Sequence, residues 1–193
     1  SDFMRPYLQA KFFNLPNSLS FVRLLPAPVL IIMLLSPGKG ESLAAAIVFA
    51  LVCVTDWLDG YLARRYGIVT SFGKFLDPLA DKILIITAFI MLIPPGRVPA
   101  WLVAAIVGRA IAVTGLRAVA ADAGVVISAS PLGKYKTIFQ IVCLVPLIVH
   151  YTYFGLDFHL IGTVLLVPAF ILTMASGIEY FVKFFKGSGL KDD

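Results

Sequence analysis

The stretch DWLDGYLARRYGIVTSFGKFLDPLAD, residues 56–81, places four aspartates between two long apolar runs. The run LAAAIVFALVCV precedes it, and ILIITAFIMLI follows it. A carboxylate at the centre of a lipid bilayer costs about 2.5–3.5 kcal/mol or more. The runs therefore predict membrane-spanning helices, and the four acids between them need cationic partners that offset this cost.

The composition extends this prediction to the whole chain. Of 193 residues, 60% are hydrophobic and 14% charged, whereas a soluble domain has about 25% charged residues. A span takes about 20 apolar residues, so the length allows six spans with short loops. The sequence thus predicts an all-α, polytopic membrane protein. Its expected parts are an interfacial helix at residues 4–15 and a single six-helix transmembrane domain at 16–186, with spans near 18–35, 42–64, 74–93, 100–123, 130–151 and 158–184.

The distribution of basic residues predicts the orientation. With six spans, both termini and the loops after the second and fourth spans share one side. All 16 Lys and Arg residues lie on or next to that side except Lys39 and Arg97, and basic residues favour the cytosolic side. We therefore expect a protein of the cytoplasmic membrane with residues 56–81 facing the cytosol. Topology then accounts for the net charge of +5, and no nucleic-acid partner is expected.

The four aspartates fall on two helical stripes. Asp56 and Asp59 are three residues apart, in line with Gly60, Ala63 and Arg64, and Asp77 and Asp81 are four apart. Residues three and four apart lie on the same face of a helix. Since a turn of about nine residues joins the two helices, they run antiparallel, and the four carboxylates can converge.

Oxygen ligands without a nearby His or Cys favour a hard divalent cation. We therefore expect Mg²⁺ or Mn²⁺, with two ions balancing the four carboxylates. Gly60 and Gly73 would let a ligand approach the backbone. The alternative is an ion-pair network at a helix end, in which the glycines only allow the helices to pack closely.

The same stretch resembles a known signature. It fits D-x2-D-G-x2-A-R-x8-G-x3-D-x3-D at every fixed position, which is similar to the motif of the CDP-alcohol phosphotransferases. The resemblance implies that an alcohol attacks the β-phosphorus of CDP-diacylglycerol and that CMP leaves. It implies a homodimer, and it implies roles for the motif residues: metal ligation by Asp56, Asp59, Asp77 and Asp81, base catalysis by Asp81, and contacts to the CDP portion by Gly60, Arg64 and Gly73.

Four basic residues outside the motif predict the acceptor. Arg109 lies inside an apolar run, eight residues before Arg117 and loosely on the same helix face, while Lys134 and Lys136 open the next span. Guanidinium groups can bind a phosphate monoester bidentately. The alternative is that these cations reach lipid headgroups or mark the cytosolic side.

Short segments resemble one branch of the family, whose acceptor is sn-glycerol 3-phosphate. They are LPNSLSFVR, AVTGLR, LGKYKT and SGIEYF. The resemblance implies that the four basic residues hold the acceptor phosphate. It also places Asn17 and Arg23 near the donor, although Asn17 could equally cap the first span.

Two other functions remain open. The same chemistry could use another acceptor, such as inositol phosphate or serine. Intramembrane acids also mark ion pathways, so a divalent-cation transporter is the alternative from another class. The acids lie near one membrane face, however, and the flanking runs carry no polar track, which disfavours a transporter. Glu179, an acid within the last span, should pair with a basic residue that the sequence does not identify.

Overall fold

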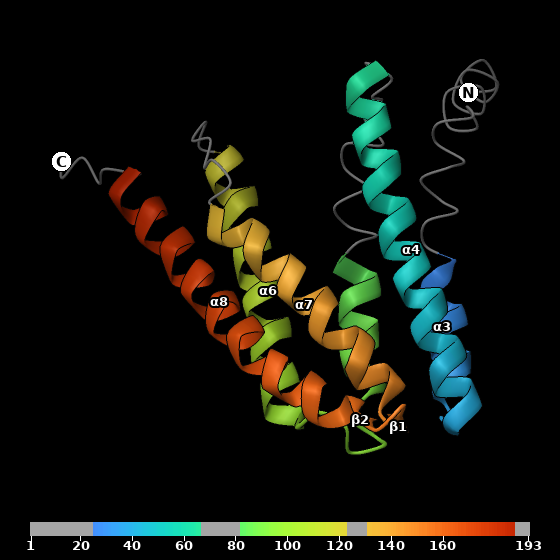
Figure 1. Cartoon of the computed structure of the whole chain (residues 1–193). Helices are drawn as coiled ribbons and strands as arrows, with labels where there is room; N and C mark the ends of the chain where they lie inside the picture. The colour runs from blue at the N-terminus through green and yellow to red at the C-terminus, as the bar shows by residue number, and fades with distance from the viewer. Residues whose placement is uncertain (1–24, 67–81, 123–130, 188–193) are drawn as a thin grey trace, which may run out of the picture. The chain divides into compact units, whose positions relative to one another are not determined.

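The computed structural model describes residues 25–66, 82–122 and 131–187 (Figure 1). The chain divides into two compact units, Ser1–Met91 and Leu92–Asp193. Every element in the described residues is a helix except for one short β-hairpin, so the predicted all-α class is confirmed. The expected interfacial helix at residues 4–15 lies outside the described residues.

The first unit is built around a helical hairpin. Helix α3 (Pro26–Leu34) packs on α4 (Lys39–Tyr66). The backbone amide of Ser42 donates to the carbonyl oxygen of Gly38 at 2.9 Å. This helical hydrogen bond starts α4 directly after the loop that follows α3. The buried residues of α4 fall on one stripe, as expected for a helix that buries one face: Ser42, Ala45, Ala46 and Phe49. A further helix is described over Lys82–Met91.

The second unit contains three long helices, namely α6 (Ala100–Asp122), α7 (Pro131–Val149) and α8 (Phe158–Gly187). Helix α8 packs against both α6 and α7. Helix α7 begins at Pro131, one residue after the predicted start of the fifth span. Proline suits this position because the first helical residue needs no backbone N–H donor. The carboxyl ends of α6 and α8 and the start of α7 lie at the same end of this unit (Figure 1).

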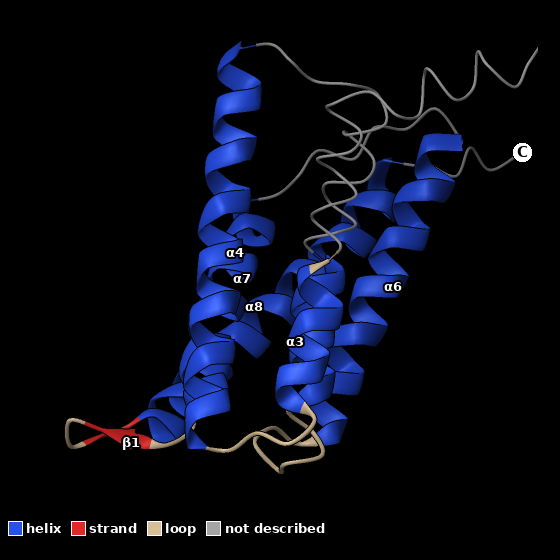
Figure 2. Ribbon diagram, turned by 90° about the vertical axis from the view of Figure 1, so that its right-hand side faces the viewer, coloured by secondary structure: helices blue, strands red, loops and turns tan. Residues whose placement is uncertain are grey.

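A β-hairpin that the sequence did not predict joins α7 to α8. Strands β1 (Thr152–Tyr153) and β2 (Leu156–Asp157) pair antiparallel (red in Figure 2). The two residues between them have positive φ, 53° at Phe154 and 78° at Gly155. Two central residues with positive φ are typical of the type I′ turn, which suits a two-residue hairpin loop. The hairpin makes α7 and α8 run antiparallel.

Small residues let α7 and α8 approach closely. A Cβ atom added at Gly162 would lie 2.8 Å from the backbone nitrogen of Leu147, which leaves no room for a side chain there. Further along α8, the buried residues recur at intervals of three and four, the spacing of a helix face packed along a neighbour: Leu166, Ala169, Thr173, Ser176 and Tyr180. One face of α8 is therefore committed to contacts within its unit.

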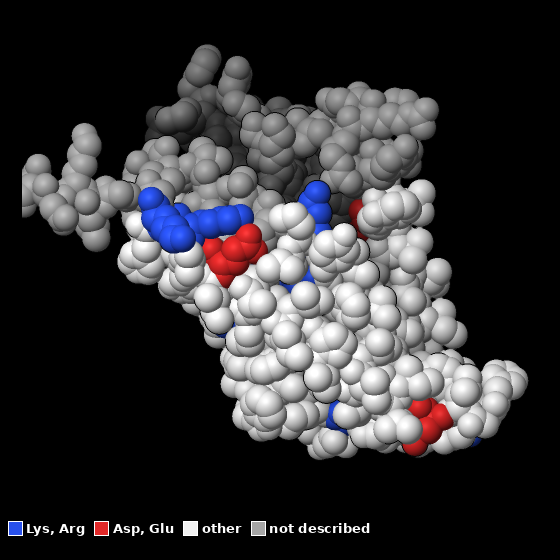
Figure 3. Space-filling view, turned by 60° about the vertical axis from the view of Figure 1, so that its left-hand side comes forward, with Lys and Arg blue, Asp and Glu red and all other residues white. Residues whose placement is uncertain are grey.

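Four of the described helices are long and apolar enough to cross a membrane, over Lys39–Leu58, Ala100–Ala121, Pro131–Val149 and Phe158–Lys186. Many of their large apolar side chains are exposed, among them Ile111, Ile138 and Ile171, as expected for surfaces that face lipid. On the face seen in Figure 3, charged side chains form small groups and uncharged ones cover the surface between them. Parts of the first and third predicted spans lie outside the described residues, so the number six stays a prediction.

A buried arginine closes the end of the second unit that carries the hairpin. Arg97, which is only 4% exposed, donates from Nη1 to the carbonyl of Ile148 at 2.6 Å. Its Cζ atom lies 5.8 Å from the ring centroid of Tyr151. Burial lowers the pKa of Arg97, while Tyr151 acts in the opposite direction. The guanidinium thus satisfies one of the carbonyls that the last turn of α7 leaves without a helical partner.

Arg97→Met is therefore expected to destabilise the protein by about 1.5–3 kcal/mol, the contribution of a hydrogen bond from a charged group. Thermal unfolding in detergent, followed by circular dichroism, measures the change. Lys186→Met is the control, because that side chain is exposed at the end of α8 and should change stability little. An Arg97 variant as stable as the control variant would contradict the capping role.

Candidate active site

Helix α4 carries the first half of the acid motif. It continues through Asp56, Asp59, Gly60 and Arg64 to Tyr66 without a break, so the predicted helical spacing of these residues is confirmed. Asp56 is half-buried. The second half of the motif, with Gly73, Asp77 and Asp81, lies outside the described residues. The convergence of all four carboxylates therefore stays a prediction.

The donor set of the motif fits a divalent cation. Carboxylate oxygens are the ligands that Mg²⁺ and Mn²⁺ prefer, and Asp56 and Asp59 are two of them on one helix stripe. Among the described residues alone, no group of three His, Cys, Asp or Glu side chains could hold a metal ion. The predicted four-carboxylate site would include the two aspartates beyond the described residues.

Arg109 crosses from α6 to α8. Its Nη2 donates to the hydroxyl oxygen of Ser176 at 2.9 Å. The aliphatic part of the side chain lies across Gly177, where an added Cβ atom would come within 2.9 Å of the arginine Cγ. The Nε–H of Arg109 is buried and has no hydrogen-bond partner in the part of the chain that the structure describes. Ser176 and Gly177 of α8 therefore hold the Arg109 side chain in place.

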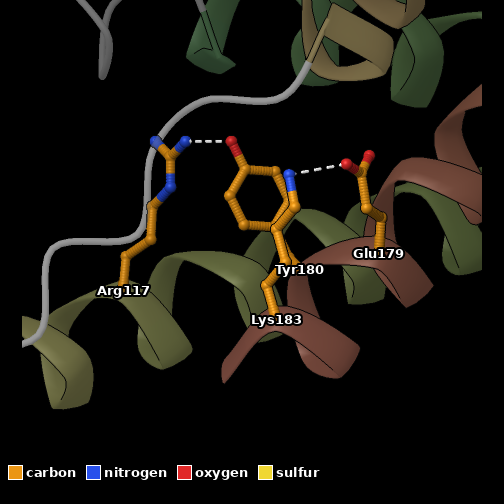
Figure 4. A network of polar contacts seen from close by, with 4 residues as sticks. All are labelled: Arg117, Glu179, Tyr180 and Lys183. Atoms are coloured by element: carbon orange, nitrogen blue, oxygen red, sulfur yellow. Dashed lines mark hydrogen bonds and ion pairs between the residues drawn. The ribbon is translucent and has the colours of Figure 1, made fainter. Parts of the chain in front are cut away.

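Arg117 makes the corresponding contact two turns further along α6. Its Nη2 donates to the hydroxyl oxygen of Tyr180, and its Cζ atom lies 4.7 Å from the centroid of the same ring, close enough for a cation–π interaction. Figure 4 shows the guanidinium directed at the tyrosine hydroxyl. Both arginines contact α8, which confirms that they share a face of α6.

Glu179 pairs within α8. Its Oε1 accepts from Nζ of Lys183 at 2.7 Å, one helical turn away (Figure 4). The sequence placed this acid in the last span without naming its partner, and the structure identifies one. Both side chains are partly exposed, so the pair adds little stability. It does place a cation beside the acid, which reduces the negative charge near Arg117.

The two lysines lie at the start of α7. Lys134 is exposed and Lys136 is half-buried, and this helix start shares its end of the unit with the carboxyl ends of α6 and α8 (Figure 1). The structure thus brings the lysines and Arg117 to one end of the unit. Asn17 and Arg23, expected near the donor, lie outside those residues.

A polar row on α8 includes Ser176 and Tyr180 of the segment SGIEYF, but its contacts were not predicted from the sequence. The amide of Gln140 on α7 donates to the hydroxyl of Thr173 at 3.0 Å, and Ser176 donates to the carbonyl of Thr173 at 3.1 Å. With Tyr180, these α8 residues are spaced three and four apart. That spacing, within an apolar span, is the signal that could have revealed them.

These features define a class: a polytopic helical membrane protein with the first half of an acid motif on α4 and two guanidinium groups of α6 fixed against α8. The CDP-alcohol phosphatidyltransferase family model matches residues 13–178. The chain belongs to this family, and the family expected from the acid motif is confirmed.

Three relatives cover most of the chain. It is 43% identical over 183 residues to a CDP-diacylglycerol–glycerol-3-phosphate 3-phosphatidyltransferase of Bacillus subtilis (strain 168), covering 89% of this chain and 95% of the relative. A protein of the same name from Rickettsia typhi is 37% identical over 169 residues, 87% of this chain and 95% of the relative. A probable phosphatidylglycerophosphate synthase of Mycobacterium tuberculosis (strain H37Rv) is 37% identical over 184 residues, 94% of this chain and 86% of the relative.

Proposed function

We propose that this protein transfers the phosphatidyl group of CDP-diacylglycerol to sn-glycerol 3-phosphate, forming phosphatidylglycerophosphate and CMP. The names of the relatives support this reaction. The observation in the structure that carries the choice of acceptor is the pair Arg109 and Arg117, which are both fixed against α8. Such donors suit a phosphorylated alcohol better than serine or free inositol.

The acceptor hydroxyl oxygen forms the new bond to the β-phosphorus, and the bond from that phosphorus to the oxygen of CMP breaks. In this proposal Asp81 takes the hydroxyl proton, and CMP leaves with the electron pair of the broken bond. Gly60, Arg64, Gly73, Asn17 and Arg23 bind the CDP portion. Arg109, Arg117, Lys134 and Lys136 bind the phosphate of the acceptor and orient its hydroxyl toward the β-phosphorus.

Asp56, Asp59, Asp77 and Asp81 would hold the divalent cations, two Mg²⁺ or Mn²⁺ ions in this proposal. The ions supply positive charge against the diphosphate and the leaving oxygen. We further propose a homodimer in the cytoplasmic membrane, with the acid motif and both termini on the cytosolic side. The apolar surfaces of the helices meet membrane lipid, while the acyl chains of the substrate extend into the bilayer and its cytidine faces the cytosol.

The test is CMP release by the detergent-purified protein supplied with CDP-diacylglycerol and Mg²⁺. We expect release with glycerol 3-phosphate and little or none with inositol phosphate, inositol, serine or no acceptor. Release with a different alcohol would keep the family chemistry and overturn the choice of acceptor. No release with any of them would overturn the proposed function, and ion-flux assays in vesicles would then test the transporter alternative.

Metal removal is a separate prediction. EDTA should abolish CMP release, because the four carboxylates would then repel one another and the diphosphate would lack its counter-charge. Adding back Mg²⁺ or Mn²⁺ in excess should restore the rate, and Ca²⁺ serves as the comparison. Full activity in EDTA would contradict the assignment of the aspartates as metal ligands.

A further inference from the structure

We infer that α8 positions the acceptor-binding arginines: Ser176 and Gly177 fix Arg109, and Tyr180 fixes Arg117, so that α8 sets the preference for a phosphorylated acceptor. The inference rests on the proposed function, which places the acceptor phosphate at these two arginines. It adds three residues of the last helix that the acid motif and the basic residues did not include.

Gly177 determines where the Arg109 side chain can run. A Cβ atom there would meet Cγ of Arg109 at 2.9 Å and Nε at 3.1 Å, and real Cβ atoms are rarely that close to another atom. The nearer of these atoms is close to the root of the arginine side chain, so a small movement of the guanidinium end cannot relieve the contact. With alanine at position 177, Arg109 would have to adopt another rotamer.

Ser176 fixes the guanidinium end of Arg109. Its hydroxyl oxygen accepts from Nη2 of Arg109, while its own proton is donated to the carbonyl of Thr173. Ser176 is fully buried, so its hydroxyl has no competing water in this arrangement. The Nε–H of Arg109, which lacks an acceptor among the described residues, then keeps a defined direction.

Tyr180 fixes Arg117 in two ways. The ring lies under the guanidinium, and the hydroxyl oxygen accepts from Nη2. The tyrosine is 3% exposed while Arg117 itself is exposed, so a buried anchor holds an accessible cation. An unanchored arginine has many rotamers, and binding a ligand would cost the entropy of ordering it. The tyrosine removes part of that cost before the ligand arrives.

The charges around this arrangement favour an anion. Arg109 and Arg117 carry like charges on one face of α6. Lys183, on the turn after Tyr180, forms an ion pair with Glu179. Glu179 is the only acidic residue in the sequence of α8, so its negative charge already has a cationic partner. A phosphate dianion would offset the repulsion between the two arginines, whereas a neutral alcohol would not.

The test uses Gly177→Ala and Tyr180→Phe, each with a matched control. Gly162→Ala also adds a methyl group to a crowded glycine of α8, but it meets Leu147 rather than an arginine. Tyr153→Phe removes a tyrosine hydroxyl at the hairpin end of the unit. Initial rates of CMP release, with each substrate varied in turn, give the KM for glycerol 3-phosphate and for CDP-diacylglycerol.

We expect Gly177→Ala and Tyr180→Phe each to raise the KM for glycerol 3-phosphate about tenfold, the effect of one weakened charge-assisted hydrogen bond. The KM for CDP-diacylglycerol should stay within about twofold. The controls should leave the ratio of the two KM values unchanged, even where Gly162→Ala lowers thermal stability. Equal rises in both KM values, or no rise in either, would overturn the inference.

A binding titration separates this inference from the proposed function. Calorimetry with glycerol 3-phosphate and the detergent-purified protein needs no turnover. If the wild-type protein binds glycerol 3-phosphate without releasing CMP, the proposed function fails, and weaker binding by the two α8 variants still supports the inference. Equal binding by wild type and variants, or no binding by the wild type, overturns it.

Discussion

Asp81→Asn is expected to lower turnover by about 10²–10⁴-fold, the usual contribution of a general base, while it preserves much of the binding of CDP-diacylglycerol. The amide keeps the size of the carboxylate but cannot accept the hydroxyl proton. The other three aspartates of the motif, as proposed metal ligands, would remain to hold the ions against the diphosphate. The kcat from CMP release and the affinity for the CDP-lipid, measured by titration, are compared with those of the wild type.

Asp56→Asn is the matched variant, because it changes a proposed metal ligand that is not the proposed base. Binding of the CDP-lipid and turnover should both fall in this variant, since the diphosphate loses part of its counter-charge. If the two variants lose lipid binding to the same extent, the assignment of Asp81 as the base is wrong, and Asp81 acts only as a ligand.

Arg109→Ala is expected to raise the KM for glycerol 3-phosphate by about 10–150-fold, which corresponds to roughly 1.5–3 kcal/mol for a hydrogen bond to a charged group. The KM for CDP-diacylglycerol should change far less, because the arginine is proposed to contact only the acceptor. The variant also removes the buried Nε–H and the contact with Ser176. Rates with each substrate varied in turn measure the two effects.

Arg109→Lys is the informative comparison. Lysine keeps the charge but lacks the planar fork that binds a phosphate bidentately, and it has no group at the position of Nε. We expect only partial recovery of the KM for glycerol 3-phosphate. Full recovery would mean that the charge alone matters. A larger rise in the KM for CDP-diacylglycerol than for the acceptor would mean that the acceptor pocket lies elsewhere.

The helices of the second unit could be predicted closely from the sequence. Pro99 and Pro131 precede or begin long apolar runs, and α6, α7 and α8 start at Ala100, Pro131 and Phe158. The second predicted span begins near residue 42, whereas α4 starts at Lys39. The difference has a simple cause: apolar runs locate the bilayer, while a helix can continue through charged residues beyond it.

The acid motif shows what spacing can and cannot predict. The spacing of Asp56, Asp59 and Arg64 indicated a helix stripe, and α4 is helical there. Convergence with Asp77 and Asp81 depends on how two helices approach each other, which spacing along one helix does not determine. Likewise, Arg109 stood out because an arginine is costly in an apolar run. Its partners on α8 lie in the quoted segment SGIEYF, but a serine, a glycine and a tyrosine carry no comparable cost in a membrane helix, so nothing in the sequence paired them with the arginines.

The two-residue turn at Phe154 and Gly155 has a consequence for how the protein assembles. The turn closes a connection of only eight residues, 150–157, between α7 and α8, so the loss of chain entropy is small when the two helices come together. This pairing forms the hydrogen bond from Gln140 to Thr173. Neither polar side chain then needs a third helix to supply a hydrogen-bond partner for this contact inside the bilayer. Pairing of α7 with α8 would thus form the surface on which α6 and its two arginines pack.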